Sequence, residues 1–310
     1  MGAGAVGGHF GARLVRAGRD VDFLVRPARA ALLRERGLRL QALDGTVETV
    51  PVTAVTADAL TPGYDLVILA VKSYGLDSAL KDIAPAMGPD TTVLPFLNGM
   101  RHMDALIDRF GADRVYGGVA MVQTRLGDGG EIVEVGPMAR LVYGPVTDTP
   151  VLAPADVHAA LDTGTFSATA TENAMQELWD KWVFLATMGA CNCLMRAPIG
   201  RINSTAGGRD FTRTVFDEAA AVAAAAGHPV RPSVRERTDR MLGDTRSPAT
   251  TSLYWDLTHD NPVEADHIIG DLVARGRALD VPTPLFALAD LHLRVYEAGR
   301  DRTTPSAGGR

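Results

Sequence analysis

The chain has 310 residues, of which 46% are hydrophobic and 22% are charged, and its net charge is -6. This composition is typical of a globular protein with room for two ordinary domains. The charge excludes an overall basic surface for nucleic acid, and no apolar run reaches the roughly 18 residues of a membrane span. With only two cysteines, Cys191 and Cys193, we expect a cytoplasmic protein without a disulfide framework.

Strands and helices alternate in the first half of the chain. The continuous apolar run at 65–73, DLVILAVKS, is typical of a parallel strand that is covered on both faces. Other expected strands lie at 21–26, 91–99, 115–122, 131–135 and 139–144, and helices are expected at 8–17, 28–36 and 75–86. This order predicts an α/β fold with a Rossmann-like, doubly wound domain over residues 1–171.

The second half has helical periodicity instead. Apolar residues recur at helical spacing within 172–195, and three further helices are expected at 210–227, 263–282 and 284–299. We therefore predict an all-helical domain over residues 172–300. The tail, 301–310, has no apolar face, and we expect it to be disordered.

Three glycines near the start, Gly2, Gly4 and Gly7, form a G-x-G-x-x-G pattern ahead of the first helix. In dinucleotide-binding folds the first glycine allows a tight turn, the second lets the pyrophosphate approach, and the third permits close helix packing. Arg26 ends the next strand, where an arginine accommodates the 2′-phosphate of NADP. The pattern predicts NADPH as the cofactor. Alternatively, Arg26 is a solvated charge, and Arg29 could share the phosphate.

Four further motifs accompany the glycines. They are AVKSYG with Lys72, LNGM with Asn98, LWDKW with Lys181, and TSLYWDLTHDNPVEAD with Ser252, Asp256 and Glu264. Together they resemble the ketopantoate reductase (2-dehydropantoate 2-reductase) family, over residues 1 to about 298. The resemblance implies NADPH-dependent reduction of a 2-oxo acid to a 2-hydroxy acid, with 2-dehydropantoate or a related carbonyl compound as the substrate.

The resemblance also implies residue roles. Lys181 would be the general acid that protonates the carbonyl oxygen as hydride arrives. Glu264 would orient the cofactor or the lysine, although a carboxylate is also favoured at the start of a helix. Ser252 would hold the substrate carboxylate, unless it only caps a helix. Lys72 and Asn98, each after a buried strand, would line the nicotinamide end of the cofactor site.

The chain departs from the family at three positions. Well-studied members carry asparagines four and eight residues after the lysine and another near the end of that helix, where this chain has Leu185, Gly189 and Ile199. An apolar wall discriminates weakly for a substrate hydroxyl, so the departure leaves the identity of the 2-oxo acid open. Asn192 lies on the same segment but is out of register with the lost pair.

The residues also permit different functions and a different proton donor. A non-catalytic NADPH-binding regulatory protein would need no proton donor, and His259 or His267 could replace Lys181 as the acid. A methyltransferase is disfavoured by Arg26, because an unphosphorylated ribose favours an acidic residue there. We expect no metal site, because Cys191 and Cys193 have no histidine cluster beside them. A small 2-oxo acid is the expected partner, and the chain could form a homodimer.

The glycine pattern raises one further expectation. In the resembling family, about seven residues of a central strand precede the first glycine, and Met1 matches the last of them. Deletion of that strand would leave edges on both of its neighbours and remove core area. We therefore expect Met1 to be an internal residue of the natural protein, with a mis-assigned start codon.

Overall fold

The computed structural model describes residues 1–303, and for 301–303 it describes the backbone only. The disorder predicted for 301–310 is wrong at 301–303, because these residues continue the last helix, and 304–310 lie outside the described residues. The chain forms two compact units. One comprises Met1–Leu97 with His102–Leu178, and the other comprises Asn98–Arg101 with the chain from Trp179 onward.

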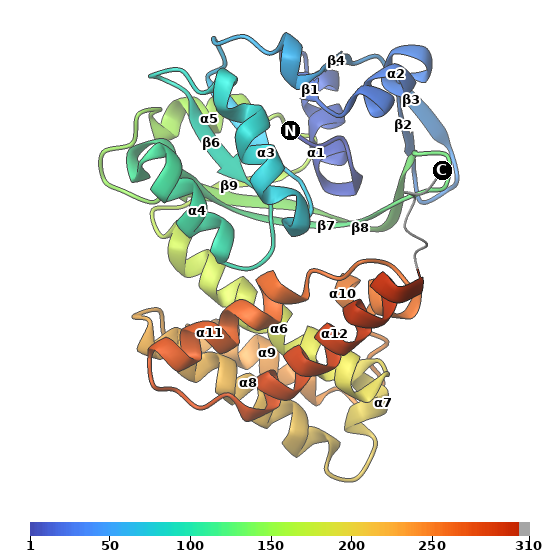
Figure 1. Ribbon diagram of the computed structural model, residues 1–310, viewed down its shortest axis with the longest axis vertical. Helices are drawn as coiled ribbons and strands as arrows, with labels where there is room; N and C mark the ends of the chain where they lie inside the picture. Colours follow the sequence, from blue (N-terminus) through green and yellow to red (C-terminus); the bar gives the residue numbers. More distant parts are fainter. Residues whose placement is uncertain (304–310) are drawn as a thin grey trace. The chain divides into compact units, whose positions relative to one another are not determined.

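The first unit combines helices and strands (Figure 1). In chain order its main elements are α1 (Ala5–Arg16), β1 (Asp22–Leu24), α2 (Pro27–Arg36), β2 (Leu38–Gln41), β3 (Val47–Val50), β4 (Thr53–Val55), β5 (Leu66–Leu69), α3 (Leu76–Ile83), β6 (Thr92–Pro95), α4 (Arg101–Phe110), β7 (Tyr116–Leu126), β8 (Ile132–Pro145), α5 (Pro154–Leu161) and β9 (Ser167–Ala170). The long helix α6 (Ala174–Met195) begins in this unit and continues into the second.

The strands form three groups in the described chain. β1 pairs with β4 and β5 pairs with β6, both in parallel. A mixed sheet has the order β3-β2-β8-β7, with β9 parallel to β8. The predicted α/β class is confirmed, but the β2–β3 hairpin and the long antiparallel β7–β8 pair were not predicted. β6 is buried at every position, including the polar Thr92, as is typical of a strand covered on both faces.

Helix α1 lies unusually close to the strands because glycines face them. A Cβ on Gly11 would come within 2.6 Å of the Phe23 ring, and one on Gly8 would overlap the Ile132 side chain. Phe10 and Leu14, on the same helix, belong to a second apolar cluster with β6, β7 and β8. The helix is therefore held against the strands by close approach and by apolar burial together.

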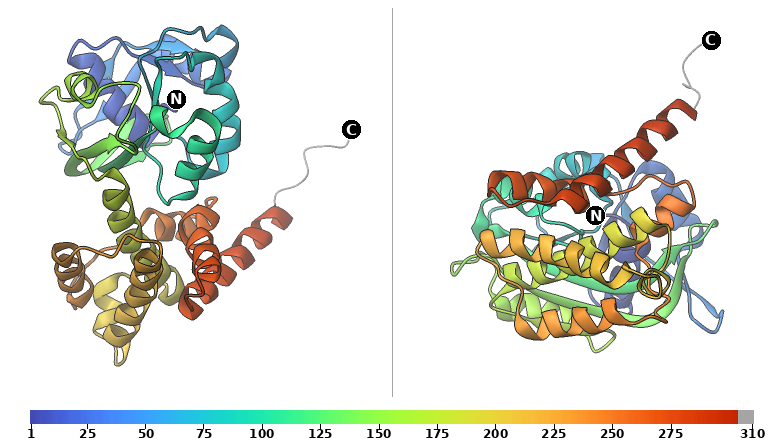
Figure 2. Two further views of the ribbon diagram at one scale, coloured as in Figure 1. Left: turned by 90° about the vertical axis from the view of Figure 1, so that its left-hand side faces the viewer. Right: turned by 90° about the horizontal axis from the view of Figure 1, so that it is seen from below.

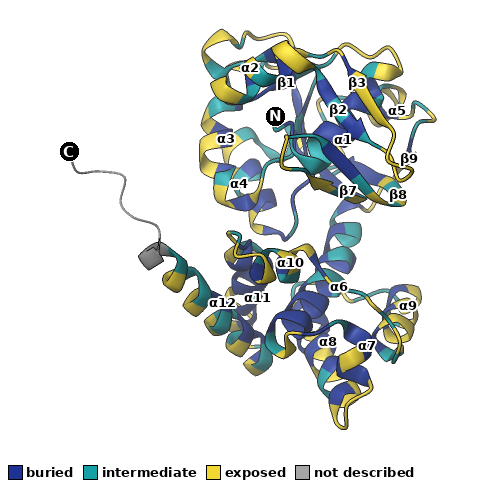
Figure 3. Ribbon diagram, turned by 90° about the vertical axis from the view of Figure 1, so that its right-hand side faces the viewer, coloured by how far each residue is buried: buried dark blue, intermediate teal, exposed yellow. Residues whose placement is uncertain are grey.

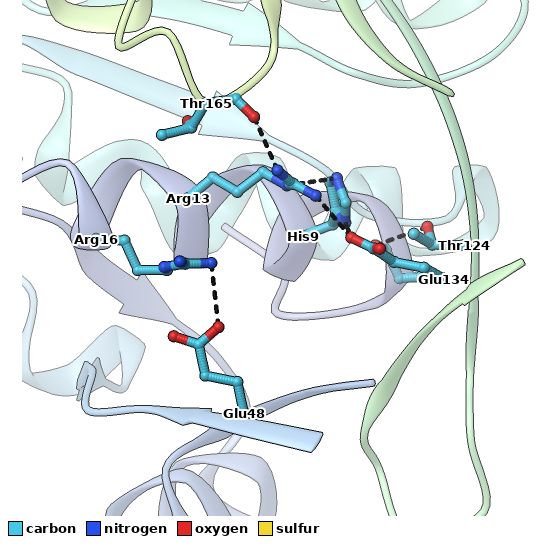
Figure 4. Close-up of polar contacts among 8 residues, drawn as sticks. His9, Arg13, Arg16, Glu48, Thr124, Glu134 and Thr165 are labelled. Atoms are coloured by element: carbon cyan, nitrogen blue, oxygen red, sulfur yellow. Dashed lines mark hydrogen bonds and ion pairs between the residues drawn. The ribbon is translucent and has the colours of Figure 1, made fainter. Parts of the chain in front are cut away.

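His9 on α1 is buried within a polar cluster (Figure 4). Arg13 donates from Nε to His9 Nε2 at 2.9 Å, from Nη2 to Glu134 Oε1 at 2.6 Å, and from Nη1 to the Thr165 carbonyl at 2.8 Å. Burial lowers the pKa of His9 to about 4; the Arg13 cation adds to this effect and the Glu134 carboxylate opposes it. His9 is therefore a neutral hydrogen-bond acceptor at pH 7.

We expect His9 to make stability fall on acidification. The unfolded chain binds a proton near the ordinary pKa of 6.5, whereas the folded chain does so near 4. Between these values the unfolded state holds more protons, so the free energy of unfolding rises with pH, by at most about 1.4 kcal/mol per pH unit. His9→Gln keeps an acceptor for Arg13 and should flatten this slope in urea unfolding. An unchanged slope, or an equal flattening in the exposed control His259→Gln, would contradict the assignment.

The second unit is entirely helical in its described part. Besides most of α6, it contains α7 (Ile199–Asn203), α8 (Gly208–Ala225), α9 (Pro232–Gly243), α10 (Ser252–Thr258), a π-helix (Asp266–Gly270), α11 (Asp271–Ala278) and α12 (Pro284–Thr303). Its largest fully buried side chains are Trp182, Phe216 and Phe286. No helix in the described chain has the length and apolar character that a membrane span requires.

A buried carboxylate from α8 holds the start of α12. Glu218, 9% exposed, accepts hydrogen bonds from the amides of Leu285 and Phe286 at 3.1 Å. These amides belong to the first turn, which has no partners within its own helix and carries partial positive charge. From this point α12, red in Figure 2, runs past the other helices of its unit.

We expect Glu218→Ala to destabilise the protein by about 1.5–3 kcal/mol, because it leaves buried amides without a charged acceptor. The neighbouring Asp217 is exposed and pairs with Arg235 at 3.1 Å, so Asp217→Ala should cost only about 0–1 kcal/mol. Urea unfolding of both variants tests the difference. Equal losses would show that Glu218 contributes no more than a surface charge.

Candidate active site

The turn before α1 brings three backbone segments into close approach. Gly2 has φ +94°, and a Cβ there would lie 2.7 Å from the Ala70 carbonyl oxygen. A Cβ on Gly7 would overlap the Gly2 carbonyl oxygen and lie 2.7 Å from the Ala70 Cβ. Any side chain at Gly2 or Gly7 would therefore push α1 away from the end of β5.

Gly4 is different because it faces open space. It is the N-cap of α1, and nothing lies within 4 Å of the position that its Cβ would occupy. No side chain caps the first turn. The first amides of a helix attract anions, and a glycine at the cap lets a phosphate approach the backbone. The residues of this turn therefore fit the pyrophosphate of a dinucleotide.

Two arginines follow β1 and have different surroundings. Arg29 Nη2 donates to the carbonyl oxygens of Ala3 at 3.1 Å and Gly130 at 2.8 Å, and so connects the glycine turn to the β7–β8 loop. Arg26, at the N-cap of α2, is exposed. Of the two, Arg29 has its guanidinium engaged by the protein, which leaves Arg26 the better candidate for a ligand phosphate.

Lys72 and Asn98 follow the carboxyl ends of β5 and β6, but they group with different units. Lys72 is exposed and caps a short 3-10 helix in the first unit. Asn98 is half-buried and belongs to the second unit. Lys72 thus belongs to the same unit as the three glycines and Arg26, and Asn98 belongs to the same unit as Lys181, Glu264 and Ser252.

The Asn98–Gly99 loop packs directly on the π-helix. Gly99 has φ +86°, and a Cβ there would overlap the carbonyl oxygen of His267. The continuous helix predicted over 263–282 is wrong at its start, because Glu264 precedes the helix and a π-helical turn at Asp266–Gly270 leads into α11. A π-turn is wider than an α-turn, and such turns are frequent at functional sites.

Helix α6 is hydrogen-bonded to the same π-helix. Trp182, 1% exposed, donates from its indole Nε1 to the carbonyl of Ile268 at 2.9 Å, and both groups are buried. The neighbouring residue is Lys181, so this hydrogen bond fixes where the backbone of Lys181 lies relative to Glu264. Helical periodicity places Trp182 among the apolar residues of α6, but it carries no signal for the indole hydrogen bond.

Lys181 and Glu264 influence each other electrostatically. Lys181 is half-buried and Glu264 is 7% exposed. Burial lowers the pKa of Lys181 to about 8, and the Glu264 carboxylate opposes that lowering. A lysine in this state is still protonated at pH 7 but gives up its proton more readily than an ordinary lysine. The pair can therefore polarise a bound carbonyl and protonate the oxygen of its reduced form.

The three positions at which this chain departs from the family's asparagines have no polar side chain and are partly or fully buried. Leu185 is half-buried one turn along α6, and Ile199 is 1% exposed. A Cβ on Gly189 would lie 3.2 Å from Leu253, so apolar packing occupies that position. Asn192 is buried and donates to the Ala197 carbonyl at 2.9 Å, which is a structural contact.

The remaining candidates are more exposed. Ser252 is the first residue of α10 and is exposed, while the side chain of Thr251 caps that helix. His259 is exposed and stacks on Trp255 with ring centroids 4.0 Å apart. Burial and the Arg101 cation lower the pKa of His267, which leaves it largely neutral at pH 7.

The two units match one protein family. The model for ketopantoate reductase PanE/ApbA matches residues 1–148, and the model for the C-terminal part of the same family matches residues 173–295. The fold and these matches define an oxidoreductase. The chain belongs to the ketopantoate reductase family.

Individual relatives agree with this assignment. An uncharacterised oxidoreductase of Bacillus subtilis is 29% identical over 96% of this chain and 98% of its own. The 2-dehydropantoate 2-reductase of Mesorhizobium japonicum is 29% identical, with 92% of each chain covered. The crystal structure of a PanE/ApbA family ketopantoate reductase from Ralstonia eutropha superposes with a TM-score of 0.85 at 29% identity, covering 97% of this chain and 98% of that one.

Proposed function

We propose that this chain catalyses NADPH-dependent reduction of a 2-oxo acid to the 2-hydroxy acid, with 2-dehydropantoate or a related carbonyl compound as the substrate. The observation that carries the proposal is the partly buried Lys181, with a pKa of about 8, beside the buried carboxylate of Glu264. A protein that only bound the cofactor would have no need for a titratable cation held in this way. The family membership supports the same reaction class.

In the proposed reaction, Lys181 and Glu264 control the proton that the carbonyl oxygen receives. When bound, the reduced nicotinamide supplies a hydride to the carbonyl carbon. The Lys181 ammonium donates a hydrogen bond to the carbonyl oxygen and transfers one proton to it as the negative charge develops. Glu264 keeps the lysine protonated between turnovers, and the neutral amine regains its proton from water. The products are the 2-hydroxy acid and the oxidised cofactor.

The glycine turn supports a dinucleotide as the hydride source. The open backbone at Gly4 and the exposed Arg26 fit the pyrophosphate and the 2′-phosphate of NADPH. Lys72, at the end of β5, would lie near the nicotinamide. The family resemblance also assigns Asn98 and Glu264 to the cofactor and Ser252 to the substrate carboxylate.

The residues at the three departures from the family pattern bear on the choice of substrate. Leu185 and Ile199 cannot hydrogen-bond to a substrate hydroxyl, and Gly189 carries no side chain. Sites that lack such contacts discriminate weakly between substrates with and without the hydroxyl. A panel of 2-oxo acids, with and without a hydroxyl on the side chain, should be screened for NADPH oxidation. If no member of the panel gave carbonyl-dependent oxidation, a regulatory NADPH-binding protein would replace the enzyme.

We expect Arg26→Ala to weaken NADPH binding and to leave NADH binding nearly unchanged. A lost arginine–phosphate contact costs on the order of 1.5–3 kcal/mol, which is about 10- to 150-fold in affinity. Fluorescence titration with both cofactors measures the effect, and Arg36→Ala, at the exposed far end of α2, is the matched control. Equal weakening of NADPH and NADH would show that Arg26 does not read the phosphate.

We expect Lys181→Ala to reduce kcat by about 10²–10⁴-fold and to change NADPH affinity by no more than a few-fold. Lys181→Arg should also lose turnover, because a guanidinium does not release its proton.

In the unaltered enzyme the acid must be protonated, so the rate of reduction should be level at low pH and should fall above about pH 8. The exposed Lys81→Ala is the control.

Two results would contradict this assignment. Near-normal turnover in Lys181→Ala would move the proton donor to His259 or His267. A pH profile that stayed level well beyond pH 8 would show that Lys181 does not supply the proton.

A further inference from the structure

The backbone on either side of Gly4 is held by side chains from other elements. Arg29 Nη2 donates to the Ala3 carbonyl at 3.1 Å, and Thr124 Oγ1 donates to the Ala5 carbonyl at 3.0 Å. Arg29 belongs to α2 and Thr124 belongs to β7, so the two donors come from segments that are far apart in the sequence. Gly4, which faces open space, therefore lies between two carbonyl groups that are each held by a hydrogen bond.

A held carbonyl also fixes the amide that follows it. The peptide unit is planar and trans, so the C=O of one residue and the N–H of the next point in opposite directions. The bond to Ala3 therefore orients the amide of Gly4, and the bond to Ala5 orients the amide of Val6. Val6 lies in the first turn of α1, whose amides have no acceptor within their own helix. Each of the two amides thus points away from the donor that holds its peptide unit.

An irregularity in the β7–β8 pair precedes Thr124. The register of the two strands shifts just before Thr124, which is paired with Glu134 (Figure 4). Bulges and similar irregularities re-aim side chains and are frequent beside functional sites. Residues opposite each other in an antiparallel pair present their side chains on the same face. Both side chains accordingly contact α1, since Thr124 reaches the Ala5 carbonyl and Glu134 accepts from Arg13 at 2.6 Å.

The loop between β7 and β8 is shaped around Arg29. The same Nη2 atom that holds Ala3 also donates to the Gly130 carbonyl at 2.8 Å. Gly130 has φ +77°, and a Cβ there would lie 2.5 Å from Arg29 Nη1, so the position requires glycine twice over. Arg29 is half-buried, and its positive charge is held close to the glycine turn by these two carbonyls.

The rest of α1 is held by packing and not by such hydrogen bonds alone. Helix α1 lies next to β7 and β8 (Figure 3). A Cβ on Gly8 would overlap the Ile132 side chain of β8, and Phe10 belongs to an apolar cluster with β7 and β8. The start of the helix has no comparable apolar anchor at Gly4, which faces open space. The orientation of its first peptide units therefore depends on Arg29 and Thr124.

We propose that Arg29 and Thr124 are positioning residues for the dinucleotide, in that they hold the peptide units on either side of Gly4 so that the amides of Gly4 and Val6 face the pyrophosphate. This role rests on the proposed function. Amides that are already oriented bind an anion more tightly, because less backbone must be ordered on binding. NADPH and NADH both carry the pyrophosphate, so this role applies to both cofactors, unlike the 2′-phosphate contact proposed for Arg26.

The test measures the Kd of NADPH and of NADH for variants of the full chain. Thr124→Val removes the hydroxyl with little change in shape and should weaken both cofactors by about 3- to 10-fold, as for one lost hydrogen bond. Arg29→Met should weaken both by about 10- to 100-fold, because a charged donor is lost. Thr124→Ser keeps the hydroxyl and should bind as the unaltered chain does. At saturating cofactor, kcat should be unchanged in all three variants.

Two control variants separate this role from a general loss of stability. Arg34, also on α2, donates to the Ala54 carbonyl of β4 at 2.9 Å, so Arg34→Met removes an equivalent hydrogen bond from the same helix. Thr49→Val changes an exposed threonine of β3. Neither control should change the Kd of NADPH or of NADH.

Hydrogen exchange of the chain without cofactor gives a second measurement on the turn itself. The Gly8 amide donates to the Gly4 carbonyl at 2.8 Å and so reports on the first turn of α1. Its protection should fall in Thr124→Val and Arg29→Met but not in the two controls. Unchanged protection and unchanged binding in Thr124→Val would overturn the proposal, and this variant with Thr124→Ser decides the question if Arg29→Met does not fold.

The pattern across cofactors distinguishes the remaining outcomes. Weakening of NADPH alone in Arg29→Met would show that Arg29 reads the 2′-phosphate, and it would overturn the positioning role. Equal effects of Arg29→Met and Arg34→Met would overturn it as well, and in both cases the proposed function would stand. If the unaltered chain bound neither NADPH nor NADH, the proposed function and the positioning role would both be wrong.

Discussion

The chemistry proposed for the second unit depends on keeping a lysine charged where burial disfavours charge. Desolvation lowers the pKa of Lys181, and the Glu264 carboxylate opposes that lowering. That balance holds only if the two side chains keep their separation, because the interaction of charges changes steeply with distance and local polarity. The hydrogen bond from Trp182 to Ile268 ties the backbone next to Lys181 to the π-helix that follows Glu264, and Gly99 packs on the same π-helix at His267.

A different constraint applies to the first unit, where the glycine turn must approach the backbone at the end of β5 closely. The turn at Gly2 and Gly7 can contact the end of β5 only because neither residue has a Cβ. Gly4 faces open space, so no contact within the described chain requires a glycine there. The turn could be predicted from the G-x-G-x-x-G motif, because the steric requirement for glycine is local in sequence. The motif could not predict that Arg29 donates to the carbonyls of Ala3 and Gly130, because Gly130 is far away along the chain.

The difference between local sequence features and contacts between distant residues also explains which elements could be predicted from the sequence. Strands β5 and β6 were found because they are continuously apolar, and α6 was found from helical spacing. The π-helix was missed because helical spacing cannot separate it from an α-helix when its geometry is set by contacts with Trp182 and Gly99. The cap of α12 comes from Glu218, which lies 67 residues from Leu285. Such contacts leave no periodic signal, and the roles of Lys181 and Glu264 could be suggested only by resemblance.

The rarity of lysine relative to arginine in this chain adds a physical reason to connect Lys181 with proton transfer. Lysine and arginine together number 31 in this chain, yet lysine occurs only at Lys72, Lys81 and Lys181. Arginine serves elsewhere as the cation, in ion pairs and in carbonyl contacts such as those of Arg13 and Arg29. Arginine holds its proton under all ordinary conditions, whereas burial brings a lysine into the range in which it can release one. A buried cation that only had to bind an anion could have been arginine, so the lysine at 181 is consistent with a group that must also titrate.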